Sequence, residues 1–432
     1  MKRAFLHPGA PATVEAPHRN QMGAVMSPPD VSTRQGSARV IAVLGALVAL
    51  GPLTIDMYLP ALPRVVSDLG ASDALVQLTL TGTLLGLGLG QLAIGPLSDA
   101  LGRRRPLLAG VAVHVIASAL TACAADLAAM GALRILQGLG AAAATVVAMA
   151  IVRDLFDGHR AAAAVSRLML VMGVAPILAP TLGSAVLVVG DWRWVFAVLA
   201  VLGIGVIVLA ALALPETLPP ARRRTLGIRQ VLASYRAVVD DPHFRPLVAT
   251  TALSFAAMFA FVAGSSFVLQ GQYGMDEQQF SAIFGSCAVV MVASSQVNPV
   301  LLRHHRPERI AAAGLAAVLV AGVVLITLQL LQVGGVLGFL LPVAVMLAGG
   351  WLVIPNTTAA ALSRHGEAAG TAAAVIGAAQ FTCGALTAPA VGTLGGDGLA
   401  TAVVMSAAVA LAAVALTRAL LPLPALTTGE LS

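Results

Sequence analysis

Charged side chains are scarce in this chain of 432 residues: Asp, Glu, Lys and Arg together make up 10% of it, whereas hydrophobic residues make up 58%. A soluble globular domain carries roughly a quarter charged residues. So few charges cannot cover a protein with a water-soluble surface, which argues against an ordinary soluble protein. Lipid must therefore replace water around most of the fold.

Aromatic residues are also few, at 4% of the chain, and the chain has only three cysteines. Cys123, Cys287 and Cys383 all lie in apolar runs and have neither disulfide nor zinc spacing, so we predict no metal site and no cofactor. Glycine is abundant instead, with 43 residues. Small residues let membrane helices approach closely, because lipid provides no hydrophobic drive for contact between helices.

The motifs of several other protein classes are missing. The chain has no H-E-x-x-H metalloprotease motif and no Walker-type Gly-Lys-Ser/Thr loop, so neither an intramembrane metalloenzyme nor an ATP-driven pump is indicated. Asp240-Asp241 is a lone acidic pair, whereas a prenyl transferase needs Asp-rich clusters. No segment is long enough to form an appended soluble domain, as expected of a receptor or sensor. We therefore predict a protein that is not an enzyme.

Twelve apolar runs approach or exceed the length of about 20 residues that crosses a bilayer as a helix. The sequence predicts an all-α integral membrane protein with twelve transmembrane helices in two six-helix halves, 39–215 and 246–421, joined by a cytoplasmic linker at 216–245. Residues 1–38 and 422–432 are predicted to be cytoplasmic tails, the first disordered and without the apolar stretch of a signal peptide. The predicted spans are 40–62, 76–97, 106–125, 130–152, 164–189, 195–215, 246–269, 280–302, 310–332, 336–360, 369–391 and 399–421.

The 25 Lys and Arg residues are distributed unevenly over this topology. With both termini in the cytoplasm, nearly all of them fall in cytoplasmic segments, and the outer side keeps Arg64 and Arg193. This is the positive-inside pattern of membrane proteins. The net charge of +6 therefore reflects the basic residues of the cytoplasmic segments beside the membrane, and we predict no nucleic-acid partner.

Asp56 is an exception among spans that are almost free of charge. At ~1.5 Å per residue it lies roughly 25 Å along the helix from Arg39, in the outer half of the membrane. A carboxylate at this depth is costly, and by default it faces a cavity and has a function, so we predict that it binds and releases a proton. The alternatives are a hydrated carboxylate at the outer interface and an acceptor for helix-end hydrogen bonds near Pro52 and Pro60.

The segment Gly95–Pro106, between the second and third spans, combines glycines, an aspartate and three arginines. It resembles the signature loop of the major facilitator superfamily, which implies a cytoplasmic gating loop. The match departs at Ala100, where the family usually has a basic residue. The matching residues are Gly95, Leu97, Asp99, Gly102, Arg103 and Arg104.

Arg134 opens the fourth predicted span and is followed by Gln137 and Gly138. This pattern resembles a second motif of the superfamily, and in proton antiporters that arginine is tied to the proton relay. The alternative is that Arg134 extends to the outer surface. His114 in the third span is a further candidate for proton relay, although a lone His in a span is more often simply hydrogen-bonded.

The fifth predicted span carries prolines and glycines at helical spacing: Gly173, Pro176, Pro180 and Gly183. Such residues form a bendable, closely packed helix face. The run resembles the antiporter motif of drug-exporting facilitators, with Ala175 and Ser184 in place of two of its glycines. The resemblance implies export rather than uptake.

Further runs resemble the Bcr/CflA group of drug/proton antiporters: 55–63, 90–99, 191–196 and 214–218. This resemblance implies the major facilitator fold and proton-coupled export of small, mostly apolar drugs across the bacterial inner membrane. A proton-coupled uptake carrier on the same fold is the alternative. The expected partners are a small-molecule drug, protons and lipid, and the expected state is a monomer. We predict that the drug cavity includes Tyr58, Gln91, Met258 and Phe259.

Overall fold

The computed structural model describes residues 34–225, 227–366 and 368–420, and every regular element in these ranges is a helix. Within them, twelve helical segments are long and apolar enough to cross a membrane, which confirms the predicted fold class. Most of the predicted tail 1–38 and the whole of 422–432 lie outside the described residues. Residues 34–38, predicted as tail, form the start of α1.

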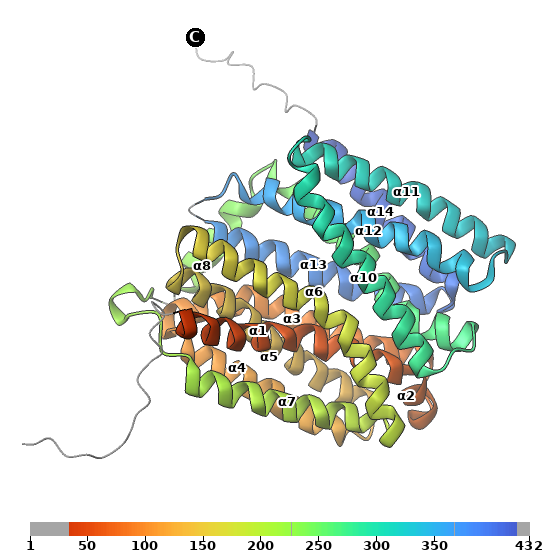
Figure 1. Ribbon diagram of the computed structural model, residues 1–432, viewed down its shortest axis with the longest axis horizontal. Coiled ribbons are helices and arrows are strands. Elements are labelled where there is room, and N and C mark those ends of the chain that lie inside the picture. Colours follow the sequence, from red (N-terminus) through yellow and green to blue (C-terminus); the bar gives the residue numbers. More distant parts are fainter. Residues whose placement is uncertain (1–33, 226, 367, 421–432) are drawn as a thin grey trace, which may run out of the picture.

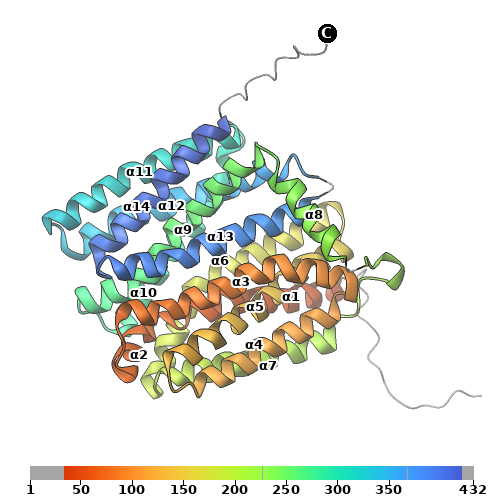
Figure 2. The ribbon, with the colours of Figure 1, turned by 180° about the vertical axis from the view of Figure 1, so that it is seen from behind.

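The helices run roughly parallel and gather in two groups (Figures 1 and 2). One group contains α1 (Arg34–Asp56), α2 (Leu62–Leu69), α3 (Asp73–Leu101), α4 (Arg104–Ala122), α5 (Leu127–Leu155), α6 (Gly158–Val189) and α7 (Trp192–Ala213). The other contains α9 (Phe244–Ser266), α10 (Glu277–Leu301), α11 (Pro307–Leu331), α12 (Gly335–Leu362), α13 (Ala369–Thr393) and α14 (Gly398–Leu420). We call these groups the first half and the second half.

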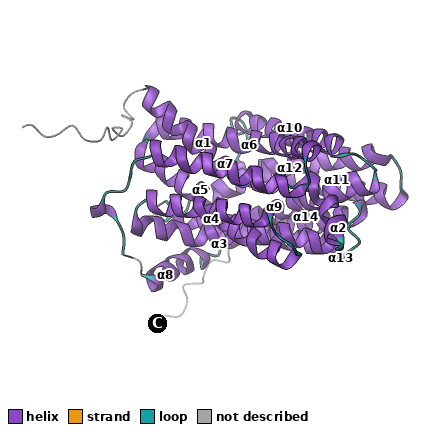
Figure 3. Cartoon of the chain, turned by 90° about the horizontal axis from the view of Figure 1, so that it is seen from below, coloured by secondary structure: helices purple, strands orange, loops and turns teal. Residues whose placement is uncertain are grey.

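A helix that the sequence did not predict, α8 (Ile228–Val239), lies in the segment between the halves. It marks one end of the bundle, which we call the linker end; α2 and the short helices η1 (Leu59–Ala61) and η3 (Phe267–Gln272) mark the opposite, far end (Figures 1 and 3). The Tyr235 hydroxyl of α8 donates to the Leu92 carbonyl of α3 at 2.7 Å. Burial and the nearby Asp99 carboxylate raise the pKa of this phenol.

The first predicted span, 40–62, is not one continuous helix. α1 ends at Asp56, and after a turn the chain continues as η1 and then α2. Pro60 and Pro63 are the second residues of these two elements. Proline lacks an N–H group and disfavours helical geometry in the residue before it, so it suits a helix start and interrupts a longer helix.

Short polar residues set several helix starts at the far end. The Ser72 side chain accepts a hydrogen bond from the Leu75 N–H, and the Asp126 carboxylate accepts one from the Ala129 N–H. Asp276 forms a reciprocal capping box at the start of α10. These caps satisfy N–H groups that have no partner within the helix.

Glycines bring α3 and α5 into direct backbone contact. A Cβ atom at Gly86 would lie 2.0 Å from the Ile135 carbonyl oxygen, and one at Gly138 would lie 2.1 Å from the Thr83 carbonyl oxygen. Any side chain at either position would force the helices apart. The close helix packing expected from the abundant glycines is therefore seen at Gly86 and Gly138.

Candidate functional site

Asp56 is the last residue of α1, and its side chain is buried, with 6% of its surface exposed. Its carboxylate makes no hydrogen bond or ion pair with any other residue in the described part of the chain. Gly45 shares a helix face with Asp56, and a Cβ atom at Gly45 would lie 3.4 Å from Val171 of α6, so this face of α1 is turned toward α6. The burial argues against a merely hydrated carboxylate at the surface.

Arg134 on α5 is fully buried, with 0% of its surface exposed, so it does not extend to the outer surface. One of its guanidinium nitrogens, Nη1, donates to the Thr54 carbonyl at 2.9 Å and to the Gln137 side-chain oxygen at 2.6 Å. The guanidinium carbon lies 4.9 Å from the centre of the Tyr58 ring and 5.4 Å from that of the Phe196 ring. Contact between a cation and aromatic faces offsets part of the cost of burying the charge.

A chain of hydrogen bonds runs from Arg134 through Gln137 to residues of α4 and ends at Thr54 of α1. The Gln137 side-chain nitrogen donates to the Ser118 hydroxyl at 2.7 Å, and that hydroxyl donates to the His114 carbonyl at 2.7 Å. The His114 ring nitrogen Nε2 lies 2.8 Å from the Thr54 hydroxyl oxygen. We call Thr54, His114, Ser118, Arg134 and Gln137 the buried polar cluster.

The cluster and Asp56 lie on opposite sides of α1. Thr54 belongs to the cluster and stands two residues before Asp56. Because two residues turn a helix by roughly 200°, the two side chains point to opposite sides of α1. The structure shows no ion pair between Arg134 and Asp56. Arg134 is therefore connected to Asp56 through the backbone of α1, by way of Thr54.

The proline–glycine motif of α6 lies between the Asp56 end of α1 and the second half. A Cβ atom at Gly183 would lie 2.1 Å from the Met57 carbonyl oxygen, so the absence of a side chain lets α6 pack against the residue after Asp56. The Pro180 carbonyl accepts a hydrogen bond from the Ser281 hydroxyl of α10 at 2.9 Å. Pro176 lies within the same helix, and a Cβ atom at Gly173 would lie 3.2 Å from a methyl group of Val292 on α10.

Direct hydrogen bonds between the two halves gather toward the far end. The Ser266 hydroxyl of α9 donates to the Leu59 carbonyl at 2.7 Å, and the Arg64 Nε donates to the Glu277 carboxylate at 2.9 Å. Arg64 also donates to the Leu187 carbonyl at 3.0 Å, near the end of α6. The structure thus has the halves joined at the far end.

We expect Glu277→Gln to weaken this closure, because it removes the charge that Arg64 meets and keeps the size of the side chain. Exposed ion pairs contribute about 0.2–1 kcal/mol to the stability of the state that contains them, and this pair is partly buried. We therefore expect the conformational equilibrium to shift several-fold toward states with the far end open. Distances between spin labels at positions 67 and 278, which are exposed on opposite halves, would measure it. Glu308→Gln, at an exposed acidic residue of the linker end, should leave the distances unchanged.

The signature loop forms a charge cluster at the linker end, within the first half. Arg103 binds Asp99 at 2.5 Å and Asp154, near the end of α5, at 2.8 Å. Burial alone would lower the pKa of the Arg103 guanidinium, but its hydrogen bonds to Asp154 and Asp99 outweigh burial and raise that pKa above its ordinary value. The Thr217 hydroxyl donates to Asp154 at 2.9 Å, which connects the segment after α7 to the cluster.

Glu216 caps the start of α4 in this cluster. Its carboxylate accepts hydrogen bonds from the Arg103 N–H at 2.8 Å and the Arg104 N–H at 3.3 Å, where the positive end of the helix dipole favours a negative charge. Gly102 has a φ of 88°, and a Cβ atom there would lie 2.4 Å from the Glu216 carboxylate. Gly102 is therefore needed both for its backbone conformation and for the close approach of Glu216. No atom lies within 4 Å of a Cβ atom built at Gly95.

The residues predicted to line a drug cavity do not come together. Tyr58 has no exposed surface and packs against both Arg134 and Phe196, with its hydroxyl 3.2 Å from that of Thr79. Gln91 on α3 packs against Gly377 of α13, where the halves meet. Phe259 is buried and stacks on Phe255 of the same helix.

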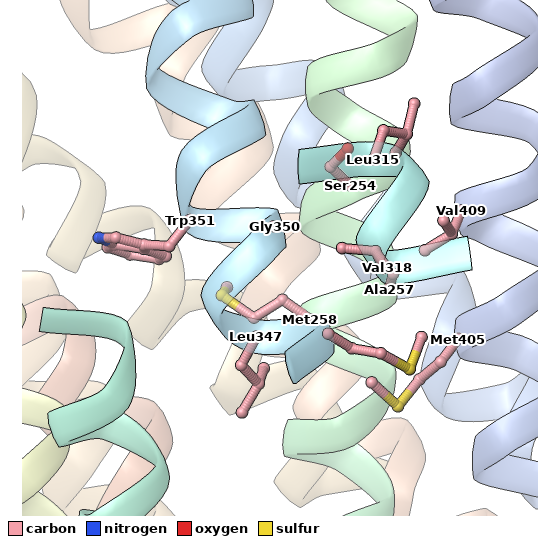
Figure 4. A pocket seen from close by; sticks show the side chains of 11 residues that line it. Ser254, Ala257, Met258, Leu315, Val318, Leu347, Gly350, Trp351, Met405 and Val409 are labelled. Atoms are coloured by element: carbon pink, nitrogen blue, oxygen red, sulfur yellow. The ribbon is translucent and has the colours of Figure 1, made fainter. Parts of the chain in front are cut away.

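Met258 lines a small cavity inside the second half, between α9, α11, α12 and α14 (Figure 4). Its walls are mostly apolar, and the Ser254 hydroxyl is a polar exception. The volume is about 10 Å³, comparable with the space needed by one water molecule. In this conformation the cavity is too small for a drug.

Sequence reasoning missed four residues of these two clusters: Thr54, Ser118, Asp154 and Glu216. Thr54 and Ser118 are polar residues in apolar spans, and Ser118 stands four residues after His114, on the same helix face. That spacing is a signal that could have grouped the two residues of α4. No local pattern could have joined Asp154 and Glu216 to Arg103, because they come from separate segments.

In the second half, Asp241 connects the segment before α9 to the turn after α12. Its carboxylate accepts a hydrogen bond from the His243 N–H at 2.9 Å and lies 3.1 Å from His365 Nε2 and 3.5 Å from Arg364 Nε. Burial alone would raise the pKa of this carboxyl, but the hydrogen bond and the neighbouring positive groups outweigh burial and lower it. The ionised form is therefore favoured in the folded protein.

We expect Asp241→Asn to destabilise the protein by roughly 1 kcal/mol near neutral pH, because the negative charge that meets Arg364 and His365 is lost, whereas the amide oxygen can still accept from the His243 N–H. Since the folded state lowers this pKa, the stabilisation is present above the unfolded value of about 4 and disappears as pH falls through the folded value. Thermal unfolding in detergent at several pH values would measure the difference between variant and wild type. Asp240→Asn is the matched control, since that exposed neighbour pairs with the exposed Arg245 and should matter little.

The sequence pattern of the Major Facilitator Superfamily matches residues 44–389, which include the signature loop and reach from α1 into α13. The chain belongs to this superfamily. Superfamily members are transporters and not enzymes, which confirms that the protein is a multi-pass membrane transporter.

Several relatives in the superfamily carry names that refer to drug resistance. The bicyclomycin resistance protein homolog of Haemophilus influenzae is 30% identical over 346 residues, which cover 80% of this chain and 87% of that protein. The chloramphenicol resistance protein of Pseudomonas aeruginosa is 30% identical over 378 residues, covering 85% and 86%. An MFS-type transporter of Bacillus subtilis, YdgK, is 33% identical over 352 residues, covering 81% and 87%.

Solved structures of the superfamily share the fold. A bacterial homolog of the human lysosomal transporter Spinster, in an inward-facing and unoccupied conformation, aligns with a TM-score of 0.71 at 16% identity, over 90% of this chain and 98% of that one. The xylose transporter XylE of E. coli, in a partially occluded inward-open conformation, aligns with a TM-score of 0.68 at 14% identity, over 88% and 97%. At these identities the likeness concerns the fold alone.

Proposed function

We propose that this protein exports small, mostly apolar drugs or toxic compounds from bacterial cells in exchange for protons, as a member of the Bcr/CflA group. The observation that carries the proposal is Asp56: a buried carboxylate without a charged partner among the described residues, at the end of α1 and against the α6 motif. A buried carboxylate within a membrane protein is costly and usually functional. The drug-resistance names of the relatives support the choice of substrate class and of export.

The proposed orientation places the linker end in the cytoplasm of the bacterial inner membrane. Basic residues gather at this end, at Arg103–Arg105, Arg222–Arg224 and Arg303–Arg309, as the positive-inside rule expects of a cytoplasmic face. The far end, where the halves are joined, then faces outward. We infer from this orientation that the hydrogen bonds at the far end close the outer side, and that drug enters from the cytoplasm or the inner leaflet.

In the proposed cycle, drug enters between the halves from the linker end, and the halves rock to open the far end. Asp56 then takes a proton from the outside, and drug is released. Protonation removes a buried charge and favours return to the state with the far end closed. The proton leaves to the cytoplasm when the next drug molecule binds.

The available energy is sufficient for substantial accumulation. One charge that crosses a potential of 100 mV gains about 2.3 kcal/mol, so a potential near 150 mV supplies roughly 3.5 kcal/mol per proton. This corresponds to a gradient of about a few hundred-fold for a neutral drug exchanged for one proton. A monovalent cationic drug exchanged for one proton would be driven by the pH difference alone.

Inverted membrane vesicles from cells that lack their own exporters would test the proposal. The vesicles are energised so that their lumen becomes acidic, and chloramphenicol, a sulfonamide and a fluorescent apolar cation are added in turn. For an antiporter, addition of a substrate dissipates part of the pH gradient, and the substrate accumulates in the lumen. Vesicles without the protein are the control, and loss of substrate from loaded vesicles into the medium would instead indicate a proton-coupled uptake carrier.

A further inference from the structure

His114 has a ring nitrogen that the buried polar cluster leaves unused. The Nδ1 atom is buried and has no hydrogen-bond partner among the described residues. It faces α7, where a Cβ atom at Gly203 would lie 3.4 Å away. A buried polar atom without a partner is costly, so its presence calls for an explanation.

The hydrogen bonds of the cluster fix which nitrogen of His114 carries the proton. The Thr54 hydroxyl has a single hydrogen, and it donates this to the Leu50 carbonyl at 2.5 Å, since a carbonyl can only accept. The hydroxyl oxygen must therefore accept from His114 at the 2.8 Å contact. Neutral His114 then carries its proton on Nε2 and has a free lone pair on Nδ1.

The charges around His114 oppose a second proton while the cluster is closed. Arg134 on α5 interacts electrostatically with His114, and both side chains contact the same residue, Thr54. Thr54 on α1 and Gly203 on α7 are uncharged, and Asp56 lies on the opposite face of α1. An imidazolium would stand beside a guanidinium without a described counter-ion, so the closed cluster requires neutral His114.

We propose that His114 is a positioning residue for Asp56: neutral His114 holds the Asp56 end of α1 through Thr54, and a proton taken up at Nδ1 opens the cluster and releases that end. The step forms one N–H bond: a brief opening of the cluster admits a hydronium ion, which gives its proton to Nδ1 and leaves as water, and the imidazolium then keeps the cluster open. Repulsion from Arg134 then favours separation of α4 from α1 and α5. This inference rests on the proposed proton-coupled transport, to which it adds a second protonation site.

Nuclear magnetic resonance with ¹⁵N-labelled histidine tests the hydrogen-bond argument without any transported compound. His114→Gln identifies the His114 signals by their loss. Near pH 8, well above the usual His pKa of about 6.5, the proposal expects a neutral ring with its proton on Nε2 and none on Nδ1. A ring with its proton on Nδ1 at that pH would overturn the proposal.

Transport by matched variants tests the coupling to Asp56. His114→Gln can still donate to Thr54 from its side-chain nitrogen, but it cannot titrate. Between about pH 6 and pH 8, the change in the transport rate should be at least about threefold larger for the wild type than for this variant. Thr54→Val breaks the link and leaves His114 intact, so it should lose the same pH response, whereas Thr54→Ser should retain it.

Equal pH profiles for wild type and His114→Gln would overturn the proposal, and so would a wild-type profile in Thr54→Val. Thermal unfolding confirms that each variant is folded before its transport is compared. If the wild type moves no compound while the NMR result is as expected, the proposed function fails, and the hydrogen-bond assignment of His114 stands.

Discussion

Asp56→Asn should abolish proton-driven accumulation of drug while leaving drug binding largely intact. Asn has nearly the size of Asp and resembles the protonated carboxyl, but it cannot release or take up a proton. The accumulation ratio should fall from as much as a few hundred-fold, the value allowed by roughly 3.5 kcal/mol, to about one. Accumulation in energised inverted vesicles and binding to purified protein would measure the two effects separately.

Two further variants sharpen this experiment. Asp56→Glu retains a carboxyl group and should retain part of the accumulation. Asp126→Asn removes an exposed carboxylate at the same end of the molecule, where Asn can also cap α5, and should have no effect on transport. If Asp56→Asn accumulates drug like the wild type, Asp56 is not the coupling site, and the relay must be sought at Arg134 or His114.

Gly138→Ala should destabilise the first half, although alanine favours helix formation by about 1 kcal/mol over glycine. The added Cβ atom would lie 2.1 Å from the Thr83 carbonyl oxygen and 3.0 Å from the Leu87 backbone nitrogen, so α3 and α5 would have to separate. Overpacking of this kind costs about 1–3 kcal/mol, and here the obstacle is backbone, which cannot turn aside as a side chain can. The expected result is a lower unfolding temperature in detergent and a reduced yield of folded protein.

Gly131→Ala provides the matched control on the same helix. No atom lies within 4 Å of a Cβ atom built at Gly131, so the substitution gains helix propensity without a clash. Its unfolding temperature should equal or exceed that of the wild type. Equal effects of the two substitutions would show that helix propensity, and not the contact between α3 and α5, governs stability at these positions.

Local features of the sequence were sufficient to predict the spans and the importance of isolated polar residues. A run of apolar residues has to be buried in lipid or protein wherever it stands, so hydropathy alone indicates twelve spans. A single carboxylate or guanidinium in such a run, as at Asp56 and Arg134, is costly in any arrangement of helices. The break after Asp56 was missed because Pro60 and Pro63 stand within the apolar pattern itself.

The sequence by itself therefore determined the twelve-helix membrane fold, the membership of a transporter superfamily and the candidate residues. The tertiary structure decided which of them meet. It separated Asp56 from Arg134 by placing them on opposite sides of α1, assembled the buried polar cluster around Thr54, and brought Glu216 and Asp154 to the signature loop. The physical reason is that burial in lipid depends on each residue and its neighbours along the chain, whereas hydrogen bonds and ion pairs depend on how separate helices are packed.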